Sequence, residues 1–154
     1  MGGDFVLSGT AEFQRLHSDF GGWDQGILND HFVDSPPFVS VNFTVDEVGP
    51  EDGPMRLIPG TQRMPETPAR CSEPATATRS GLAPLPPGCA LIRDVRTWHG
   101  GTPNLGPGTR HLPSCEYAPA AYLSIINKNM KSDLFWQPEE LLPKATMPMD
   151  CFNK

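Results

Sequence analysis

Many features that define other protein classes are missing from this sequence of 154 residues. It contains no run of lysines or arginines and its formal net charge is −6, so it lacks the basic surface that nucleic-acid binding requires. No stretch of about 18 apolar residues is present, which excludes a membrane-spanning helix. No signal peptide is visible at the N-terminus and no peroxisomal signal at the C-terminus. These absences predict a cytoplasmic protein without nucleic-acid or membrane partners.

Closely spaced cysteines and clear helix signals are lacking as well. The four cysteines, Cys71, Cys89, Cys115 and Cys151, are too far apart to form a CxxC metal or redox motif. This spacing favours reduced thiols in a cytosolic protein, although spacing alone leaves a disulfide open. The strongest helix signal covers only residues 138–142, where Pro138 would take the first helical position.

Glycine and proline, in contrast, are plentiful, with 15 and 18 residues respectively. They separate short apolar runs, a pattern typical of an all-β protein with many turns. The length fits a single domain over residues 1–154. We expect seven or eight short strands, which favours a sandwich or a closed jelly roll with little helix. The main strand candidates are residues 13–19, 38–45, 55–58, 88–95, 110–117 and 122–127.

Regularity differs strongly between segments of the chain. Residues 38–45 show the cleanest alternation, as expected for a strand with two different faces. The apolar side of this strand would carry Val39, Val41, Phe43 and Val45, and the polar side Ser40, Asn42 and Thr44. Residues 61–87 are polar and rich in proline without any periodicity, which predicts a long functional loop. Residues 100–108 predict a glycine- and proline-rich turn.

Three residues in or near the predicted strands could bind a metal ion. A strand over residues 13–19 would place His17 and Asp19 on the same side, because alternate residues of a strand share a face. His99 follows another predicted strand, and Arg110 lies in the next one. Two imidazoles and one carboxylate can bind one face of an iron(II) ion and leave the other face open. A guanidinium could then bind the far carboxylate of a keto acid on the open face.

Each of these signals is weak by itself, because an H-x-D tripeptide or a single histidine often occurs by chance. Their combination is more specific, since three segments of the chain together resemble the phytanoyl-CoA dioxygenase family. Residues 14–20 (QRLHSDF) are similar to the first metal motif of that family, and residues 93–104 (RDVRTWHGGTPN) are similar to the second. Residues 51–61 (EDGPMRLIPGT) resemble its glycine turn and the Pro-Gly-Ser/Thr step that follows.

The resemblance implies a double-stranded β-helix, a jelly roll of the cupin type, and an Fe(II)/2-oxoglutarate-dependent dioxygenase. Such an enzyme would use dioxygen to hydroxylate or otherwise oxidise a C–H bond of a small organic substrate. His17, Asp19 and His99 would then be the iron ligands. Arg110 would bind the distal carboxylate of 2-oxoglutarate, with Thr102 and Gln14 as further cosubstrate contacts. Because Asp19 retains the carboxylate that related halogenases lack, oxidation is favoured over halogenation.

Two departures from the family pattern leave alternatives open. Gly101 stands where the family often has a serine, and only about a dozen residues precede the first motif, so the N-terminal portion of the family domain is expected to be missing. The alternative to an active enzyme is a catalytically inactive or fragmentary double-stranded β-helix that acts as a binding module. A zinc hydrolase with the same three ligands is a third hypothesis. The sequence makes no prediction of the substrate's identity or of the oligomeric state.

Overall fold

The computed structural model describes residues 2–20, 34–64 and 81–122. By its internal contacts the chain divides into two units, Met1–Pro119 and Ala120–Lys154, and all the strands described below belong to the first unit. The helix expected at residues 138–142 lies outside the described residues, as do residues 123–127 of the last expected strand. No helical segment in the described ranges has the length and apolar character of a membrane span.

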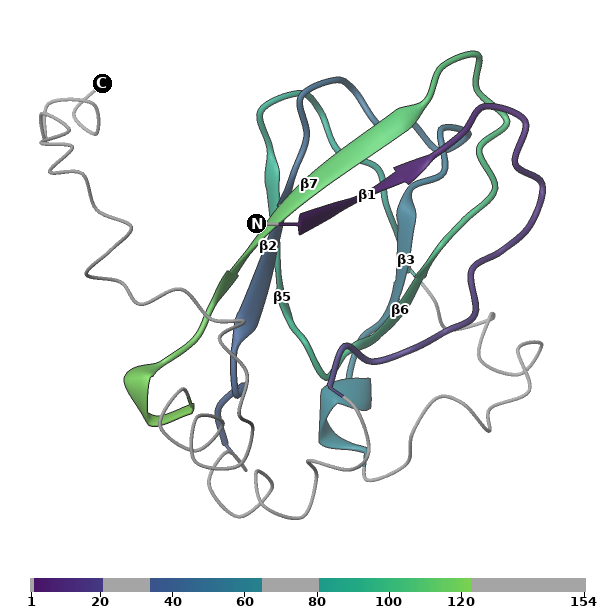
Figure 1. Ribbon diagram of the computed structural model, residues 1–154. Helices are drawn as coiled ribbons and strands as arrows, with labels where there is room; N and C mark the ends of the chain where they lie inside the picture. The colour runs from purple at the N-terminus through teal and green to yellow at the C-terminus, as the bar shows by residue number, and fades with distance from the viewer. Residues whose placement is uncertain (1, 21–33, 65–80, 123–154) are drawn as a thin grey trace, which may run out of the picture. The chain divides into compact units, whose positions relative to one another are not determined.

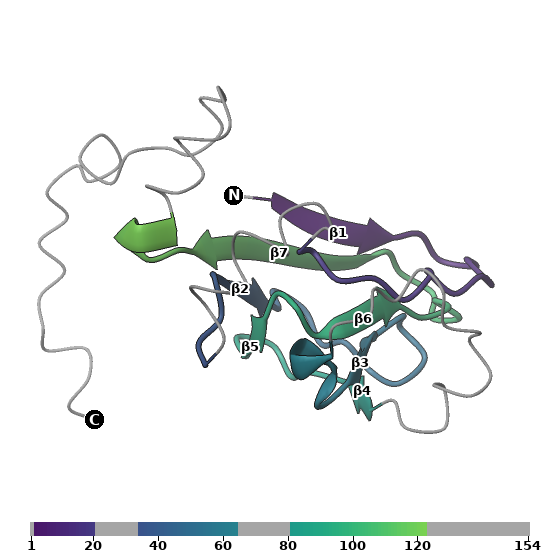
Figure 2. The same ribbon diagram turned by 90° about the horizontal axis from the view of Figure 1, so that it is seen from below.

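Within the described residues, seven strands form two antiparallel sheets that face each other (Figures 1 and 2). The first sheet has the order β1-β7-β2-β5, with β1 at Gly2–Val6, β7 at Arg110–Tyr117, β2 at Val39–Phe43 and β5 at Ala90–Asp94. The second has the order β4-β3-β6, with β4 at Gly81–Ala83, β3 at Met55–Ile58 and β6 at Trp98–Gly101. From β2 onward the chain passes repeatedly between the two sheets. This arrangement confirms the predicted all-β, double-stranded β-helix fold.

Four expected strands are confirmed, namely β2, β3, β5 and β7. Three strands, β1, β4 and β6, were not expected. The sequence Gly2-Gly3 in β1 has low strand propensity, and this strand forms because β7 offers it an open edge for pairing. Strand β4 has only three residues and lies within the segment expected to be one long loop, of which residues 65–80 are outside the described part. Strand β6 extends to Gly101, so the turn predicted at residues 100–108 wrongly includes the last two residues of this strand.

The prediction of a regular strand over residues 13–19 is wrong. This segment joins the second sheet only through a single bridge, in which the backbones of His17 and His99 exchange two hydrogen bonds of 2.9 Å. Farther along, the amide of Gln14 donates to the carbonyl of Gly101 at 3.0 Å. Between these two contacts the segment advances by three residues, from His17 to Gln14, whereas β6 advances by only two, from His99 to Gly101. The extra residue acts like a bulge and interrupts the ladder.

The glycine at position 100 allows this irregular segment to lie close to β6. A Cβ atom on Gly100 would be 2.9 Å from the carbonyl oxygen of Gln14 and 3.2 Å from that of Arg15. Any larger residue would therefore push the segment that carries His17 away from the strand that carries His99.

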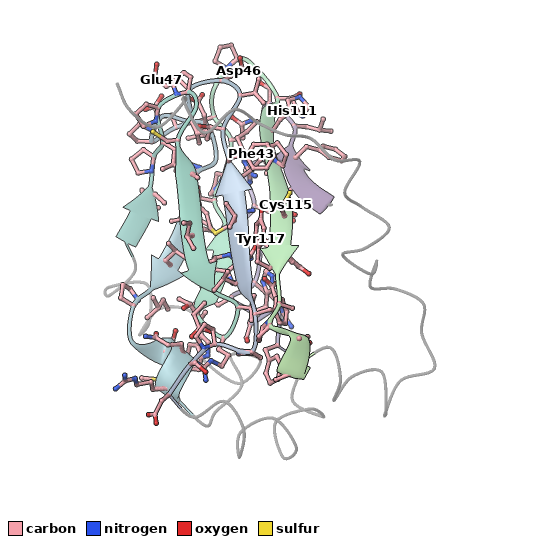
Figure 3. The ribbon with its side chains drawn as sticks, turned by 90° about the vertical axis from the view of Figure 1, so that its left-hand side faces the viewer. Phe43, Asp46, Glu47, His111, Cys115 and Tyr117 are labelled. Carbon is pink, nitrogen blue, oxygen red and sulfur yellow. The ribbon has the colours of Figure 1, made fainter. Side chains whose placement is uncertain are left out.

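The first sheet has a polar inner face and an apolar outer face around β2. The inner residues Ser40 and Asn42 are each only 2% exposed, whereas Val41 and Phe43 on the outer face are half-buried. On the neighbouring strand β5, Ile92 is 68% exposed. Figure 3 looks onto this outer face, where Phe43, Cys115 and Tyr117 are labelled. The alternation expected for residues 39–44 is thus confirmed, and its polar side is the one that the fold buries.

A small apolar core lies between the segment at residues 13–19 and the second sheet. It contains Leu16, Ile58 and Trp98, all nearly inaccessible to solvent. Next to it, the hydroxyl of Thr61 donates to the carbonyl of Ile58 at 2.7 Å and accepts the backbone N–H of Trp98 at 2.9 Å. Thr61 begins the short 3-10 helix η1, Thr61–Arg63. The Pro-Gly-Thr step thus links β3 to the start of β6.

Candidate metal centre

Three side chains from two separate segments converge at one point. One donor atom each from His17, Asp19 and His99 lies within 4.8 Å of the other two. The Oδ1 atom of Asp19 is 3.6 Å from Nε2 of His17 and 3.4 Å from Nε2 of His99. Donors at right angles around a metal bound at about 2.1 Å would be about 3 Å apart. The set is therefore close to the spacing that one shared ion requires.

The apolar core determines where the two imidazoles point. Leu16 and Trp98 directly precede His17 and His99, and both are buried in the same cluster. Neighbouring residues of an extended chain point to opposite sides. Burial of Leu16 and Trp98 therefore turns both imidazoles to the other side, where their ring centroids are 4.2 Å apart.

Backbone carbonyls fix the orientation of both rings. The Nδ1 atom of His17 is 3.0 Å from the carbonyl oxygen of Arg15, and that of His99 is 2.9 Å from the carbonyl oxygen of Thr97. A carbonyl only accepts, so each Nδ1 carries a hydrogen, and the neutral form of each ring keeps its lone pair on Nε2. Both free lone pairs belong to the nitrogens nearest Asp19. This is the tautomer that a metal site with Nε2 ligands needs.

Asp19 is ionised and held from behind by an arginine. Burial raises the pKa of Asp19, but His99 in its protonated form, which donates to the carboxylate and adds a positive charge, and then Arg93 outweigh burial and lower the pKa from 3.8 to about 2. Nη2 of Arg93 donates to Oδ2 of Asp19 at 2.5 Å. The other carboxylate oxygen, Oδ1, is the one that lies near the two imidazoles. The carboxylate is therefore in the form that binds a cation.

Arg110 is one of the residues that line a cavity of about 430 Å³. Its Nε donates to the carbonyl oxygen of Gly53 at 3.1 Å, whereas its buried Nη1 has no hydrogen-bond partner within the described ranges. Burial lowers the pKa of Arg110, the nearby charge of Asp4 raises it, and an arginine keeps its charge in either case. A buried guanidinium nitrogen without an acceptor is costly. It indicates a position for an anionic group of a ligand.

Gln14 and Thr102, the other expected cosubstrate contacts, line the same cavity as Arg110. The Oε1 atom of Gln14 accepts the backbone N–H of Gly101 at 2.9 Å, which leaves its amide nitrogen for other partners. The hydroxyl of Thr102 donates to the carbonyl of Pro54 at 2.7 Å and is buried. Its oxygen can still accept a hydrogen bond, but its single hydrogen is already in use.

The sequence reasoning missed the buried polar group behind Asp19. Nε of Arg93 donates to the Oδ1 of Asn42 at 3.4 Å, and the hydroxyl of Ser40 donates to the same oxygen at 3.4 Å. Two signals in the sequence could have revealed this group. One is the charge of Arg93 directly after the apolar residues 90–92, and the other is the polar side of the strand over residues 39–44. Both indicate an inner face that binds polar groups.

Comparison with known proteins identifies the family. The model of the phytanoyl-CoA dioxygenase (PhyH) family matches residues 6–112, about two thirds of the chain, and includes all three residues of the His-Asp-His set. The chain belongs to this family. As a member of the phytanoyl-CoA dioxygenase family, it combines the expected fold with the residues that carried the sequence resemblance. Among curated proteins, none matches the chain.

Several solved structures share the fold of this family member. AviO1 from Streptomyces viridochromogenes Tue57 is 22% identical, with a TM-score of 0.57 over 76% of this chain and 48% of that one. EctD from S. alaskensis, solved with 2-oxoglutarate and 5-hydroxyectoine, is 20% identical, with a TM-score of 0.58 over 78% and 43%. EvdO2 from Micromonospora carbonacea var. aurantiaca, complexed with 2-oxoglutarate, is 20% identical, with a TM-score of 0.52 over 75% and 51%. The chain thus spans about half the length of these structures.

Proposed function

We propose that this protein is an Fe(II)/2-oxoglutarate-dependent dioxygenase that oxidises a C–H bond of a small organic substrate. The observation that carries the proposal is the convergence of His17, Asp19 and His99 with both Nε2 lone pairs free. Family membership and structural neighbours solved with 2-oxoglutarate support it. Two imidazoles and one carboxylate are the donor set that iron(II) oxygenases use, and this set leaves positions open.

Each residue has a distinct task in this proposal. His17, Asp19 and His99 would hold the iron, which supplies the activation of dioxygen when it is bound. Arg110 would bind the distal carboxylate of 2-oxoglutarate with Nη1, which has no partner among the described residues. Gln14 and Thr102 would line the cosubstrate's path in the cavity that they share with Arg110.

The first test is the replacement Asp19→Ala. We expect Mn²⁺ affinity to fall at least about a hundredfold, because even partners behind a ligand commonly contribute ten- to a hundredfold. Iron-dependent conversion of 2-oxoglutarate to succinate should be lost as well. Titration calorimetry and a succinate assay with ascorbate measure the two effects.

Asp94→Ala is the matched control, because Asp94 pairs with Arg96 and is not part of the ligand set. It should leave Mn²⁺ affinity unchanged. Equal affinities of Asp19→Ala and the unmodified chain would remove Asp19 from the ligand set. Turnover with zinc but not with iron plus ascorbate would favour a hydrolase.

The second test is Arg110→Lys. We expect 2-oxoglutarate affinity to fall at least about tenfold, which is about 1.4 kcal/mol. Lysine keeps the charge but cannot offer two parallel N–H donors to one carboxylate. Titration of the Mn²⁺-loaded protein with 2-oxoglutarate gives the answer. An unchanged dissociation constant would mean that the distal carboxylate binds elsewhere.

A further inference from the structure

Arg93 is a buried cation whose contacts connect it to two of the candidate metal ligands. It lies on β5, opposite Ser40 of β2, and is only 9% exposed. Its Nη2 donates to the Oδ2 of Asp19, and its Nη1 is 3.4 Å from the Nδ1 of His99. Because that Nδ1 already faces the carbonyl of Thr97 at 2.9 Å, the contact between Arg93 and His99 is close but not a strong hydrogen bond. The main partner of Arg93 is therefore Asp19.

The geometry separates the two oxygens of Asp19. Oδ1 lies between the imidazole nitrogens of His17 and His99, and Oδ2 is taken by the guanidinium. A short, charge-assisted hydrogen bond occupies part of the lone-pair capacity of Oδ2 and makes it a weaker metal donor than Oδ1. Asp19 is thus prepared to offer one oxygen, which leaves more positions around the ion than a carboxylate that binds through both oxygens.

The charges of this group also favour an anion. A divalent ion with one carboxylate ligand has a net charge of +1, and Arg93 raises the charge of the local group to +2. Interactions between charges in a partly buried site are weakly screened compared with those in water. A chelating 2-oxo acid, whose carboxylate approaches the ion directly, would therefore be bound more tightly with Arg93 present.

We propose that Arg93 is a positioning residue that binds the outer oxygen of Asp19 and offsets its charge, so that the metal centre favours the anionic, chelating end of the cosubstrate. The inference depends on the proposed function, since it concerns how that cosubstrate is bound. It assigns Arg93 and Arg110 to different ends of one molecule. Arg93 would act through Asp19 on the 2-oxo-carboxylate end, and Arg110 would contact the distal carboxylate.

The test compares Arg93→Met with Arg110→Met as a matched pair of buried-arginine replacements. The Mn²⁺-loaded variants are titrated with 2-oxoglutarate, which has both carboxylates, and with 2-oxobutyrate, which lacks the distal one. We expect Arg93→Met to lower the affinity for both acids by about tenfold, equivalent to about 1.4 kcal/mol. Arg110→Met should lower the affinity for 2-oxoglutarate and leave the affinity for 2-oxobutyrate unchanged.

Mn²⁺ binding supplies a readout that a purely structural role would not give. Arg93→Met should bind Mn²⁺ about as tightly as the unmodified chain, because removal of a nearby positive charge offsets the loss of a partner behind Asp19. Arg93→Lys should recover most of the lost affinity for both acids, since it restores the charge. If Arg93→Met does not fold, Arg93→Gln keeps a donor for Asp19 without the charge and should show the same loss.

Three results would distinguish the failure of this inference from failure of the proposed function. Wild-type affinity of Arg93→Met for both 2-oxo acids would overturn the inference alone. A loss of Mn²⁺ binding in this variant would also overturn it, because Arg93 would then serve only to hold Asp19 in place. Failure of the unmodified chain to bind Mn²⁺ or 2-oxoglutarate would instead overturn the proposed function.

Discussion

The two faces of the first sheet differ in a way that reverses the usual pattern for half-buried strands. On strand β2, the polar residues Ser40 and Asn42 point inward and are almost completely buried, while Val41 and Phe43 point outward. Globular proteins normally bury the apolar side of such a strand. The reversal occurs because the inner face of β2 forms one wall of a polar site. Arg93 contacts Asn42 on this face and binds Asp19.

The outer face has the opposite character. Ile92, Phe5 and Tyr117 are each more than 60% exposed. Ile92 and Cys115 both pair with Val41 of β2, and Figure 3 shows Phe43, Cys115 and Tyr117 on this face. Exposed apolar areas of this kind commonly mark contact surfaces. The inner face of the first sheet therefore binds polar groups inside the barrel, whereas its outer face is suited to contacts outside the barrel.

The largest expected effect comes from Leu112, the apolar residue on the inner face of β7. It is 2% exposed, so Leu112→Ala should destabilise the fold by about 2–5 kcal/mol through lost burial and a residual cavity. Ile92→Ala, on the outer face of β5, should change the unfolding free energy by less than about 0.5 kcal/mol. Urea unfolding of both variants measures the difference, and equal losses would contradict the assignment of the two faces.

A smaller effect is expected when the polar inner face is made apolar. Asn42→Leu removes the acceptor shared by Arg93 and Ser40, so we expect a loss of about 1 kcal/mol despite the greater hydrophobicity. Val41→Thr makes the opposite change on the outer face of the same strand and should have a smaller cost. A stabilising effect of Asn42→Leu in thermal unfolding would show that the inner face does not need its polar groups.

The smallest effect on stability is expected from Ile92→Lys. A charge on this exposed position should change the unfolding free energy by less than about 0.5 kcal/mol. It should nevertheless reduce concentration-dependent association, because it interrupts the apolar outer face. Light scattering over a range of protein concentrations tests this, with Leu105→Lys as a control at another exposed apolar residue. Equal association of the two variants would argue against the outer face as a contact surface.

Features encoded by neighbouring residues could be predicted from the sequence, whereas features that depend on distant residues could not. His17 and Asp19 are two residues apart, and the segment around His99 is a recognisable motif, so both halves of the candidate site could be found without a structure. Arg93 was missed although it is the first residue of that motif, residues 93–104. Its importance depends on Asp19, which is 74 positions away in the chain, and no local pattern connects the two. Strand β1 was missed for a similar reason, since only pairing with β7 makes it a strand.

The sequence by itself determined the all-β character, the family and the identity of the three candidate ligands, because turns, alternation and short motifs are encoded by neighbouring residues. Only the tertiary structure decided which side of β2 is buried, which oxygen of Asp19 is free and which arginine lies behind it. Alternation defines two faces of a strand but does not say which one the fold will cover. That choice depends on contacts between residues far apart in the chain, which exist only once both sheets have formed.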